Sequence, residues 1–193
     1  LEETEKKIYT SGSQDFYLLE YSDKYSTDGK KIITGKDLGK KFTAISSFFF
    51  EYIKEFHIPT SYHKTESDII YFVSHKRFPF YTKLLNAADK KLSKIFPVKE
   101  FNPLELPVFE IYYSNGKEIL INESHLISFN QATHEEIKLM LRISSKVNAV
   151  LKSFFERRNT LLMEFNCIFA KTENKIVVVD DFSPGSMKVI TNN

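Results

Sequence analysis

Apolar residues recur along this chain at two different spacings. Phe42, Ile45, Phe49 and Ile53 follow one another every three or four residues, which predicts an amphipathic helix over 38–57. This helix should end near His57, because the Ile58-Pro59 step favours extended backbone. A second helix should begin after Thr133, which forms a capping-box pattern with Glu136. Its predicted apolar face contains Ile137, Met140, Leu141, Val147, Leu151 and Phe154.

Short apolar runs bounded by turn residues predict strands. They lie at 15–22, 68–74 and 108–113, with two more after residue 160 joined by a polar turn at Glu173-Asn174. Pro97, Pro103 and Pro107 predict a connector, and we interpret the basic stretch of residues 75–94 as the solvated face of a helix. The class is therefore α+β, with a strand-rich lobe over 1–74 and a mixed lobe over 75–193.

Composition excludes several classes of protein. The 193 residues are 42% hydrophobic and include 18 Phe and 10 Tyr, which argues against disorder. A formal charge of +2 gives no general case for nucleic-acid binding. The chain shows no apolar signal segment and no run long enough to span a bilayer. With the single cysteine, Cys167, these features predict a soluble protein of the cytoplasm, with no membrane partner.

Candidate chemistry is sparse. Asp180 and Asp181 end the apolar run 176–179, where carboxylates can hold Mg²⁺ or merely end a strand. Glu123, Ser124 and His125 could form a catalytic cluster or a polar turn before a helix. No glycine-rich phosphate loop is present. The basic stretch could bind an anion or nucleic acid instead of being a solvated helix face; its residues are His75, Lys76, Arg77, Lys83, Lys90, Lys91 and Lys94.

A series of landmarks in fixed order resembles the SAICAR synthetase family of purine biosynthesis. The landmarks are KKIY (6–9), LLEYSD (18–23), DGKK (28–31), EFHIPTSY (55–62), SDIIYFVSHKRFPF (67–80), LLNAAD (84–89), LPVFEIYY (106–113), LINESH (120–125), KVNAVLKSFFERRNTLLMEFNCIF (146–169) and KIVVVDDFSPGS (175–186). The resemblance implies a two-lobed α+β fold whose interlobe cleft holds Mg-ATP and an aminoimidazole ribotide carboxylate. In this family that carboxylate is activated as an acyl phosphate and then joined to aspartate.

The resemblance also implies roles for particular residues. Nucleotide-binding positions are Lys6, Lys30, Phe72, Val73 and His75; substrate-binding positions are Asn86, Lys91 and Lys188; metal-binding positions are Asp180 and Asp181. Many of the family's other charged positions differ here. Leu38 and Leu85 stand where the family has lysine and arginine, Asn166 and Ile168 replace a lysine and a glutamate, and Gly185 replaces an aspartate.

These departures leave three hypotheses. The first is a pseudoenzyme or repurposed nucleotide or ribotide binder, which could self-associate or pair with an active paralogue. The second is an active ATP-dependent ligase in which Lys90, Lys91 and Lys188 compensate for the lost cations. The third is an interaction module that uses the basic stretch. Because electrostatic stabilisation is usually the largest catalytic contribution, we expect the ligase reaction to be reduced or lost.

Overall fold

The computed structural model describes residues 6–27, 31–114, 118–173 and 175–191. They form two compact units. The first consists of the described residues up to Lys76 together with Ala170–Gly185, and the second of Arg77–Phe169 together with the described residues from Ser186 onward. The chain thus leaves the first unit and later returns to it, whereas the sequence-based lobes divide the chain once, at residue 74. No helix within the described ranges is long and apolar enough to cross a membrane.

The first unit contains a four-stranded antiparallel sheet, a two-stranded hairpin and one long helix. The sheet has the order β1-β2-β6-β5, β3 pairs with β4, and a bridge between Thr60 and Val178 attaches β11. The elements are β1 (Lys6–Thr10), β2 (Phe16–Tyr21), β3 (Lys24–Thr27), β4 (Lys31–Thr34), α1 (Leu38–Glu55), β5 (Tyr62–Glu66), β6 (Ile69–Val73) and β11 (Ile176–Val179). Strands β2, β6 and β11 confirm the strands predicted at 15–22, at 68–74 and after the polar turn at Glu173-Asn174.

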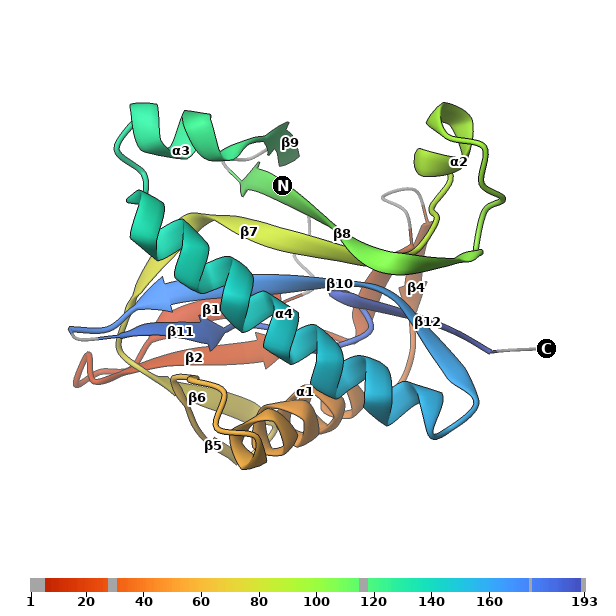
Figure 1. The fold of residues 1–193 in the computed structure, drawn as a ribbon. Helices are drawn as coiled ribbons and strands as arrows, with labels where there is room; N and C mark the ends of the chain where they lie inside the picture. Colours follow the sequence, from red (N-terminus) through yellow and green to blue (C-terminus); the bar gives the residue numbers. More distant parts are fainter. Residues whose placement is uncertain (1–5, 28–30, 115–117, 174, 192–193) are drawn as a thin grey trace. The chain divides into compact units, whose positions relative to one another are not determined.

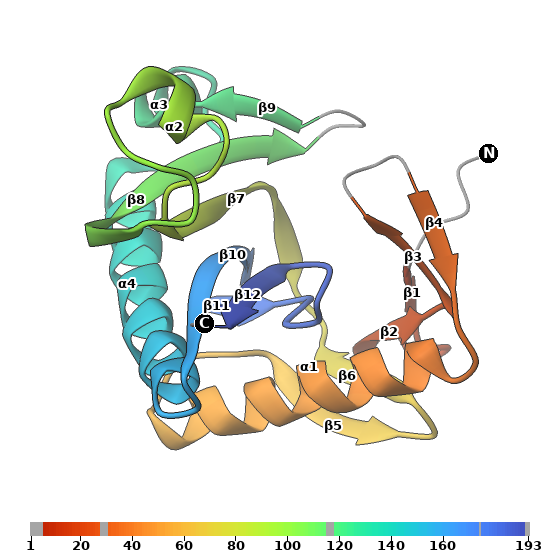
Figure 2. The ribbon, with the colours of Figure 1, turned by 90° about the vertical axis from the view of Figure 1, so that its right-hand side faces the viewer.

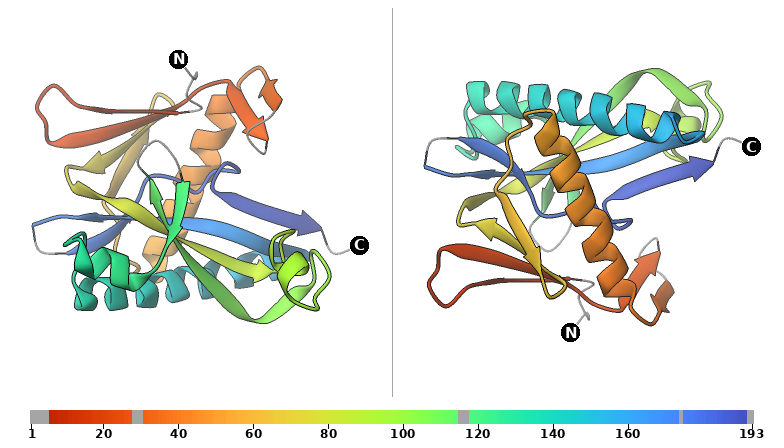
Figure 3. Two further views of the ribbon diagram at one scale, coloured as in Figure 1. Left: turned by 90° about the horizontal axis from the view of Figure 1, so that it is seen from above. Right: turned by 90° about the horizontal axis from the view of Figure 1, so that it is seen from below.

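Helix α1 confirms the predicted helical period. It buries Phe42, Phe49 and Ile53 as expected and ends at Glu55, two residues before His57. His57 has a φ of 56°, a left-handed conformation that ends the helix. The helix packs on β2, β5 and β6, which it crosses in Figure 2 and in the right panel of Figure 3.

Aromatic rings fill the space between α1 and its sheet. The Phe50 ring centroid lies 5.5 Å from that of Tyr62, 5.1 Å from that of Phe72 and 4.8 Å from that of Phe182. Such stacked and edge-on pairs add to the free energy gained by burying their area. Phe182 comes from the returning segment, so residues 170–185 complete the core of the first unit.

The second unit is a sheet covered by a long helix. The strand order is β10-β7-β8-β9, with β12 also paired to β10. The elements are β7 (Lys76–Ala87), α2 (Leu92–Ile95), β8 (Pro103–Ser114), β9 (Glu118–Ile121), α3 (Glu123–Ser128), α4 (His134–Glu156), β10 (Thr160–Lys171) and β12 (Met187–Thr191). Helix α4 runs along β7 and β10 (Figure 1), and the Thr82 and Ser144 hydroxyl oxygens lie 2.8 Å apart between β7 and the helix.

The helix beginning predicted after Thr133 is confirmed. Thr133 and Glu136 form the capping box of α4, in which each side chain bonds the other residue's backbone N–H. Asn122 caps α3, so Glu123, Ser124 and His125 form the first turn of a short helix. The sequence analysis offered a catalytic cluster or a polar turn before a helix, whereas these three residues lie within the helix itself.

The helix predicted for the basic stretch is wrong. Residues Lys76–Ala87 form strand β7, and only Leu92–Ile95 are helical. The physical reason is that side chains on both faces of the strand are buried, such as Phe80 and Leu84 on one face and Leu85 on the other. Because both faces are largely covered, the alternation of polar and apolar residues that normally marks a strand is weak in the sequence.

The proline-bracketed connector is shorter than predicted. Strand β8 begins at Pro103 and contains Pro107, two of the three prolines assigned to the connector. The register between β7 and β8 shifts between Leu85 and Ala87, where Leu85 faces Val108 and Ala87 faces Pro103. A proline is tolerated at the first position of a strand or beside such an irregularity, since no ladder hydrogen bond is required there.

Candidate functional site

A lysine and two aspartates from opposite ends of the chain meet in the first unit. The Lys6 ammonium group donates hydrogen bonds to Asp180 Oδ1 and, at 3.1 Å, to Asp181 Oδ2. The two carboxylates are buried, whereas the Lys6 side chain keeps 28% of its surface exposed. Three residues that the family resemblance implies as nucleotide and metal ligands therefore form one cluster, which we call the Lys6–Asp180–Asp181 cluster.

Local backbone geometry positions the two aspartates. Strand β11 ends at Val179, and Asp180 turns the chain with a φ of 75° in the left-handed region. The backbone N–H of Ser183 then donates to Asp181 Oδ1 at 2.6 Å, and the N–H of Phe182 donates to the Ser46 hydroxyl on α1 at 3.1 Å. Residues 180–183 are thus held by α1 and by their own turn.

Tyr21 is a member of the cluster that the sequence analysis missed. Its hydroxyl donates to Asp181 Oδ1 at 2.6 Å. Gly39 allows Tyr21 to approach α1, since a Cβ at position 39 would lie 2.5 Å from the Tyr21 carbonyl oxygen. The strand alternation that places Leu19 and Tyr21 on the same face could have identified Tyr21 as inward-facing, although not its partner.

Opposing effects set the ionisation of the cluster. Burial lowers the pKa of Lys6, but the charges of Asp180 and Asp181 outweigh it, and the net pKa is raised. Burial raises the pKa of Asp181, but the Lys6 charge and the hydrogen bonds from Tyr21 and Ser183 outweigh it, and the net pKa is lowered. Burial and the negative charge of Asp181 raise the pKa of Tyr21 far above its ordinary value. At neutral pH Lys6 is therefore an ammonium group and Asp181 a carboxylate.

The other nucleotide-binding predictions fall in different environments. Phe72 is 2% exposed and belongs to the aromatic core. Val73 donates its N–H to the Ser61 carbonyl at 2.8 Å, and its own carbonyl lies 2.9 Å from His75 Nδ1. The His75 ring lies 4.7 Å from the ring of Tyr17 between centroids. Lys30 lies outside the described residues.

Strand register places several of these groups on one sheet face. Lys6 is paired with Tyr21, Thr10 with Tyr17, and Tyr17 with Phe72. Residues directly opposite in adjacent strands point to the same face. Ile8 lies on this face between Lys6 and Thr10 and is 45% exposed. An accessible apolar side chain therefore lies beside the ammonium group of the cluster.

The predicted substrate residues are separated within the second unit. Asn86 is buried and exchanges two hydrogen bonds with Asn148 of α4, at 2.7 and 2.9 Å. Lys91 bonds Glu110 at 2.9 Å, and Lys188 lies opposite Glu164 in the register of β10 and β12. The structure therefore engages Asn86 in a structural amide pair and leaves Lys91 and Lys188 beside acidic residues.

Acidic side chains pair with some lysines of the basic stretch. Lys83 bonds Glu164 at 3.0 Å and lies opposite Glu110 in the register of β7 and β8. Together with the partners of Lys91 and Lys188, these contacts form an alternating row of charges across β8, β7, β10 and β12. Each lysine of this row lies beside a glutamate, which favours a structural role over a nucleic-acid surface.

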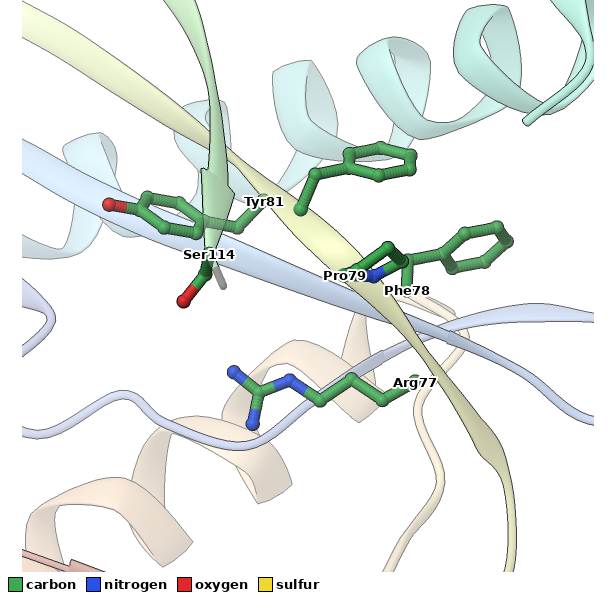
Figure 4. Close-up of a pocket in the computed structure, with 6 residues that line it drawn as sticks. Arg77, Phe78, Pro79, Tyr81 and Ser114 are labelled. Atoms are coloured by element: carbon green, nitrogen blue, oxygen red, sulfur yellow. The ribbon is translucent and has the colours of Figure 1, made fainter. Parts of the chain in front are cut away.

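One cavity borders the N-terminal end of β7. Its volume is about 330 Å³, and it is lined by Arg77, Phe78, Pro79, Phe80, Tyr81 and Ser114. Arg77 and Ser114 point into the same space in Figure 4, whereas the ring of Phe78 turns away. The Tyr81 hydroxyl donates to Glu118 at 2.6 Å, and its ring stacks on Tyr112 at 5.6 Å between centroids.

Fold and sequence together place this chain in an α+β family of purine-biosynthesis ligases. A sequence profile described as SAICAR synthetase matches residues 4–193. The chain belongs to the SAICAR synthetase family. The two-lobed α+β class expected from the landmark residues is thereby confirmed.

Relatives and solved structures resemble nearly the whole chain. The phosphoribosylaminoimidazole-succinocarboxamide synthase of Caldanaerobacter subterraneus is 29% identical over 192 residues, which is 97% of this chain and 82% of the relative. A SAICAR synthetase solved in complex with ADP matches 98% of this chain and 82% of its own, with a TM-score of 0.90 and 26% identity. The SAICAR synthetase structure from Pyrococcus horikoshii matches 95% of this chain and 82% of its own, with a TM-score of 0.87 and 26% identity.

Proposed function

We propose that this chain is a nucleotide or ribotide binder of the SAICAR synthetase family whose ligase reaction is reduced or lost. The observation that carries the proposal is the environment of Leu85, which stands where the family resemblance implies an arginine. Leu85 is fully buried in an apolar cluster with Ala88 and Leu92, and Val98, Leu104 and Val108 pack against it. A position expected to carry a cation toward an anionic substrate is thus part of a hydrophobic core.

Two further positions support the loss of ligase chemistry. Ile168 stands where the resemblance implies a carboxylate, and it is 7% exposed on β10. Asn86 retains the expected amide, but Asn148 takes both of its hydrogen bonds. Phosphoryl-transfer chemistry depends on groups that stabilise developing negative charge, and removal of one such group typically costs about 10²–10³-fold in rate.

Retained nucleotide binding is supported by the first unit. Lys6, Ile8 and Tyr17 share a sheet face, with an exposed apolar side chain between a cation and an aromatic ring. One solved relative at 26% identity is a complex with ADP. Cys167, a buried free thiol, is consistent with the reducing cytoplasm. Self-association and pairing with an active paralogue stay predictions, which light scattering of the purified chain can test.

Two measurements on the purified chain test this proposal. Calorimetric titration should detect ADP binding, and Tyr17→Ala should weaken it. Tyr9→Ala is the matched control, because Tyr9 lies opposite Leu18 in the register, on the other face of the sheet from Tyr17. An assay for SAICAR with Mg-ATP, aspartate and the ribotide carboxylate should give a rate at least about 10²-fold below that of an active relative. Turnover at the relative's rate would reject the proposal.

Sequence similarity favours an active ligase as a second candidate. Curated relatives at 27–29% identity are named as the synthase, and the alignment covers 95% or more of this chain. If Lys91 and Lys188 replaced the lost cations, changing either to methionine would abolish turnover. In the same assay, Lys94→Met, which alters an exposed lysine of α2, is the control and should leave turnover unchanged.

A further inference from the structure

The Lys6–Asp180–Asp181 cluster has the acidic pair of a cation site, but it already contains a cation. Asp180 and Asp181 are 3% and 6% exposed, and both bond the ammonium group of Lys6. Two carboxylates removed from water need a counter-charge, because burial strongly disfavours isolated ions. The Lys6 ammonium group supplies this charge from within the chain.

The hydrogen bonds of Asp181 also fit poorly with a metal ligand. Its Oδ1 accepts from the Tyr21 hydroxyl and from the Ser183 N–H, each at 2.6 Å, and its Oδ2 accepts from Lys6 at 3.1 Å. A cation approaching Oδ1 would meet two hydrogen atoms that carry partial positive charge. Both oxygens of this carboxylate are therefore directed toward donors of the chain.

Magnesium would find both carboxylates already bonded to Lys6. The ion requires near-octahedral coordination by oxygen at about 2.0–2.1 Å, with one or two carboxylates among its ligands. Across the parts of the chain that the structure describes, no three His, Cys, Asp or Glu side chains are grouped to hold a metal. Mg²⁺ would have to compete with the Lys6 ammonium group, which bonds one oxygen of each carboxylate, so the residues present do not fit the ion that the family resemblance implies.

We propose that Lys6 is the resident cation of the Asp180–Asp181 pair and that it keeps divalent metal ions out of this site. The pair is then a lysine-bonded site that stabilises the first unit, not the metal site expected from the sequence. Direct bonding of one ammonium group to both carboxylates carries this inference. The inference does not depend on the proposed function, because it concerns metal binding in the absence of nucleotide and substrate.

Mn²⁺ titration of the 193-residue chain, followed by electron paramagnetic resonance, tests the proposal. Lys6→Met removes the charge and keeps most of the aliphatic stem, so this variant should bind Mn²⁺ at least about tenfold more tightly than the unmodified chain. Lys7→Met is the matched control and should behave like the unmodified chain, because Lys7 is the next residue of β1 and is exposed. The double variant Lys6→Met/Asp180→Asn should lose the gain.

Each alternative result would overturn the proposal. The unmodified chain could bind Mn²⁺ as tightly as Lys6→Met, or a folded Lys6→Met could show no gain. If circular dichroism shows that Lys6→Met does not fold, the melting temperature of the unmodified chain decides the question. It should be unchanged by millimolar Mg²⁺, and a rise that Asp180→Asn abolishes would refute the proposal. Because the experiments contain metal but no nucleotide or substrate, loss of nucleotide binding or of turnover cannot produce any of these results.

Discussion

The Tyr21 hydroxyl is a small group on which the geometry of a buried ionic cluster depends. Asp181 accepts hydrogen bonds from the ammonium group of Lys6, from the Ser183 N–H and from this hydroxyl. Hydrogen bonds to charged groups contribute more than those between neutral groups, because the acceptor would otherwise be left with an unmet charge. Tyr21 thus connects the packing of β2 on α1 to the ionisation of Asp181.

We expect Tyr21→Phe to lower the free energy of unfolding by about 1.5–3 kcal/mol at pH 7, as for other hydrogen bonds to ions. Urea denaturation measures this, and Tyr25→Phe is the control because its hydroxyl bonds the exposed Pro184 carbonyl. The lowered pKa of Asp181 stabilises the fold above the ordinary carboxyl value of 3.8 and stops doing so as pH falls through its folded value. The difference between Tyr21→Phe and the unmodified chain should therefore shrink below about pH 4; a constant difference would contradict this.

Burial of Cys167 leads to a prediction at high pH. Burial raises the pKa of this thiol to about 12 from an ordinary value of 9.0. Between these values the unfolded chain loses the thiol proton while the folded chain keeps it, so the free energy of unfolding falls as pH rises, by at most about 1.4 kcal/mol per pH unit. Denaturation curves from pH 9 to 11 should show a shallower fall for Cys167→Ala than for the unmodified chain. Equal slopes would show that the thiol titrates alike in both states.

Among the elements, α4 and β7 are joined by polar contacts inside an otherwise apolar interface. Asn86 and Asn148 satisfy each other, and the hydroxyls of Thr82 and Ser144 form a second contact nearby. Leu84 lies between Thr82 and Asn86 on the same side of the strand and is fully buried. Paired polar groups within a hydrophobic contact fix one alignment of helix and strand, since any shift leaves them unsatisfied.

The amide pair should show strong coupling in a double-mutant cycle. Asn86→Leu or Asn148→Leu alone leaves the partner amide buried without its bonds, at a cost of about 1–3 kcal/mol in the free energy of unfolding. The double variant should lose less than the sum of the single losses, because no amide remains unsatisfied. Chemical denaturation measures all four proteins, and Ser145→Ala on the exposed side of α4 serves as the control. Additive losses would show that the pair contributes nothing as a unit.

At the scale of the whole molecule, the first unit is built from two distant segments. The segment Ala170–Gly185 supplies Asp180 and Asp181 to Lys6, Phe182 to the aromatic core and Val178 to Thr60. The chain from Arg77 to Phe169 is inserted between these parts. The first unit therefore cannot be complete until most of the chain has been made.

We expect residues 1–76 alone to lack a cooperative thermal transition in circular dichroism, because the fragment lacks the two aspartates that bond Lys6 and the Phe182 ring that packs on Phe50. Joining residues 170–185 to its end through a flexible Gly/Ser linker should restore the transition. A linked segment of the same composition in scrambled order is the control and should not. A sharp transition for residues 1–76 alone would show that the returning segment is dispensable.

Features set by neighbours in the chain could be predicted from the sequence. The period of Phe42, Phe49 and Ile53 located α1, the Thr133–Glu136 capping box located the beginning of α4, and the order of landmark residues identified the family. The helical period and the capping box each span a few residues, and the landmark residues are recognised by their order along the chain. The Asp180–Asp181 pair could likewise be singled out, because it directly follows an apolar strand.

Long-range contacts decided the rest. Lys6 and Asp180 are separated by 174 positions, and no local sequence pattern predicts that the ammonium group will bond both carboxylates. The strand β7 was predicted as a helix because its pairing with β8 and the covering of both its faces are properties of distant residues. The sequence identifies Leu85 only as a position where the family resemblance implies an arginine. Its packing against Leu92 and Val108 shows that this position belongs to a hydrophobic core. Periodicity is encoded residue by residue, but burial and charge pairing arise only when separate segments are brought together, which is why the chemistry of this site required the folded chain.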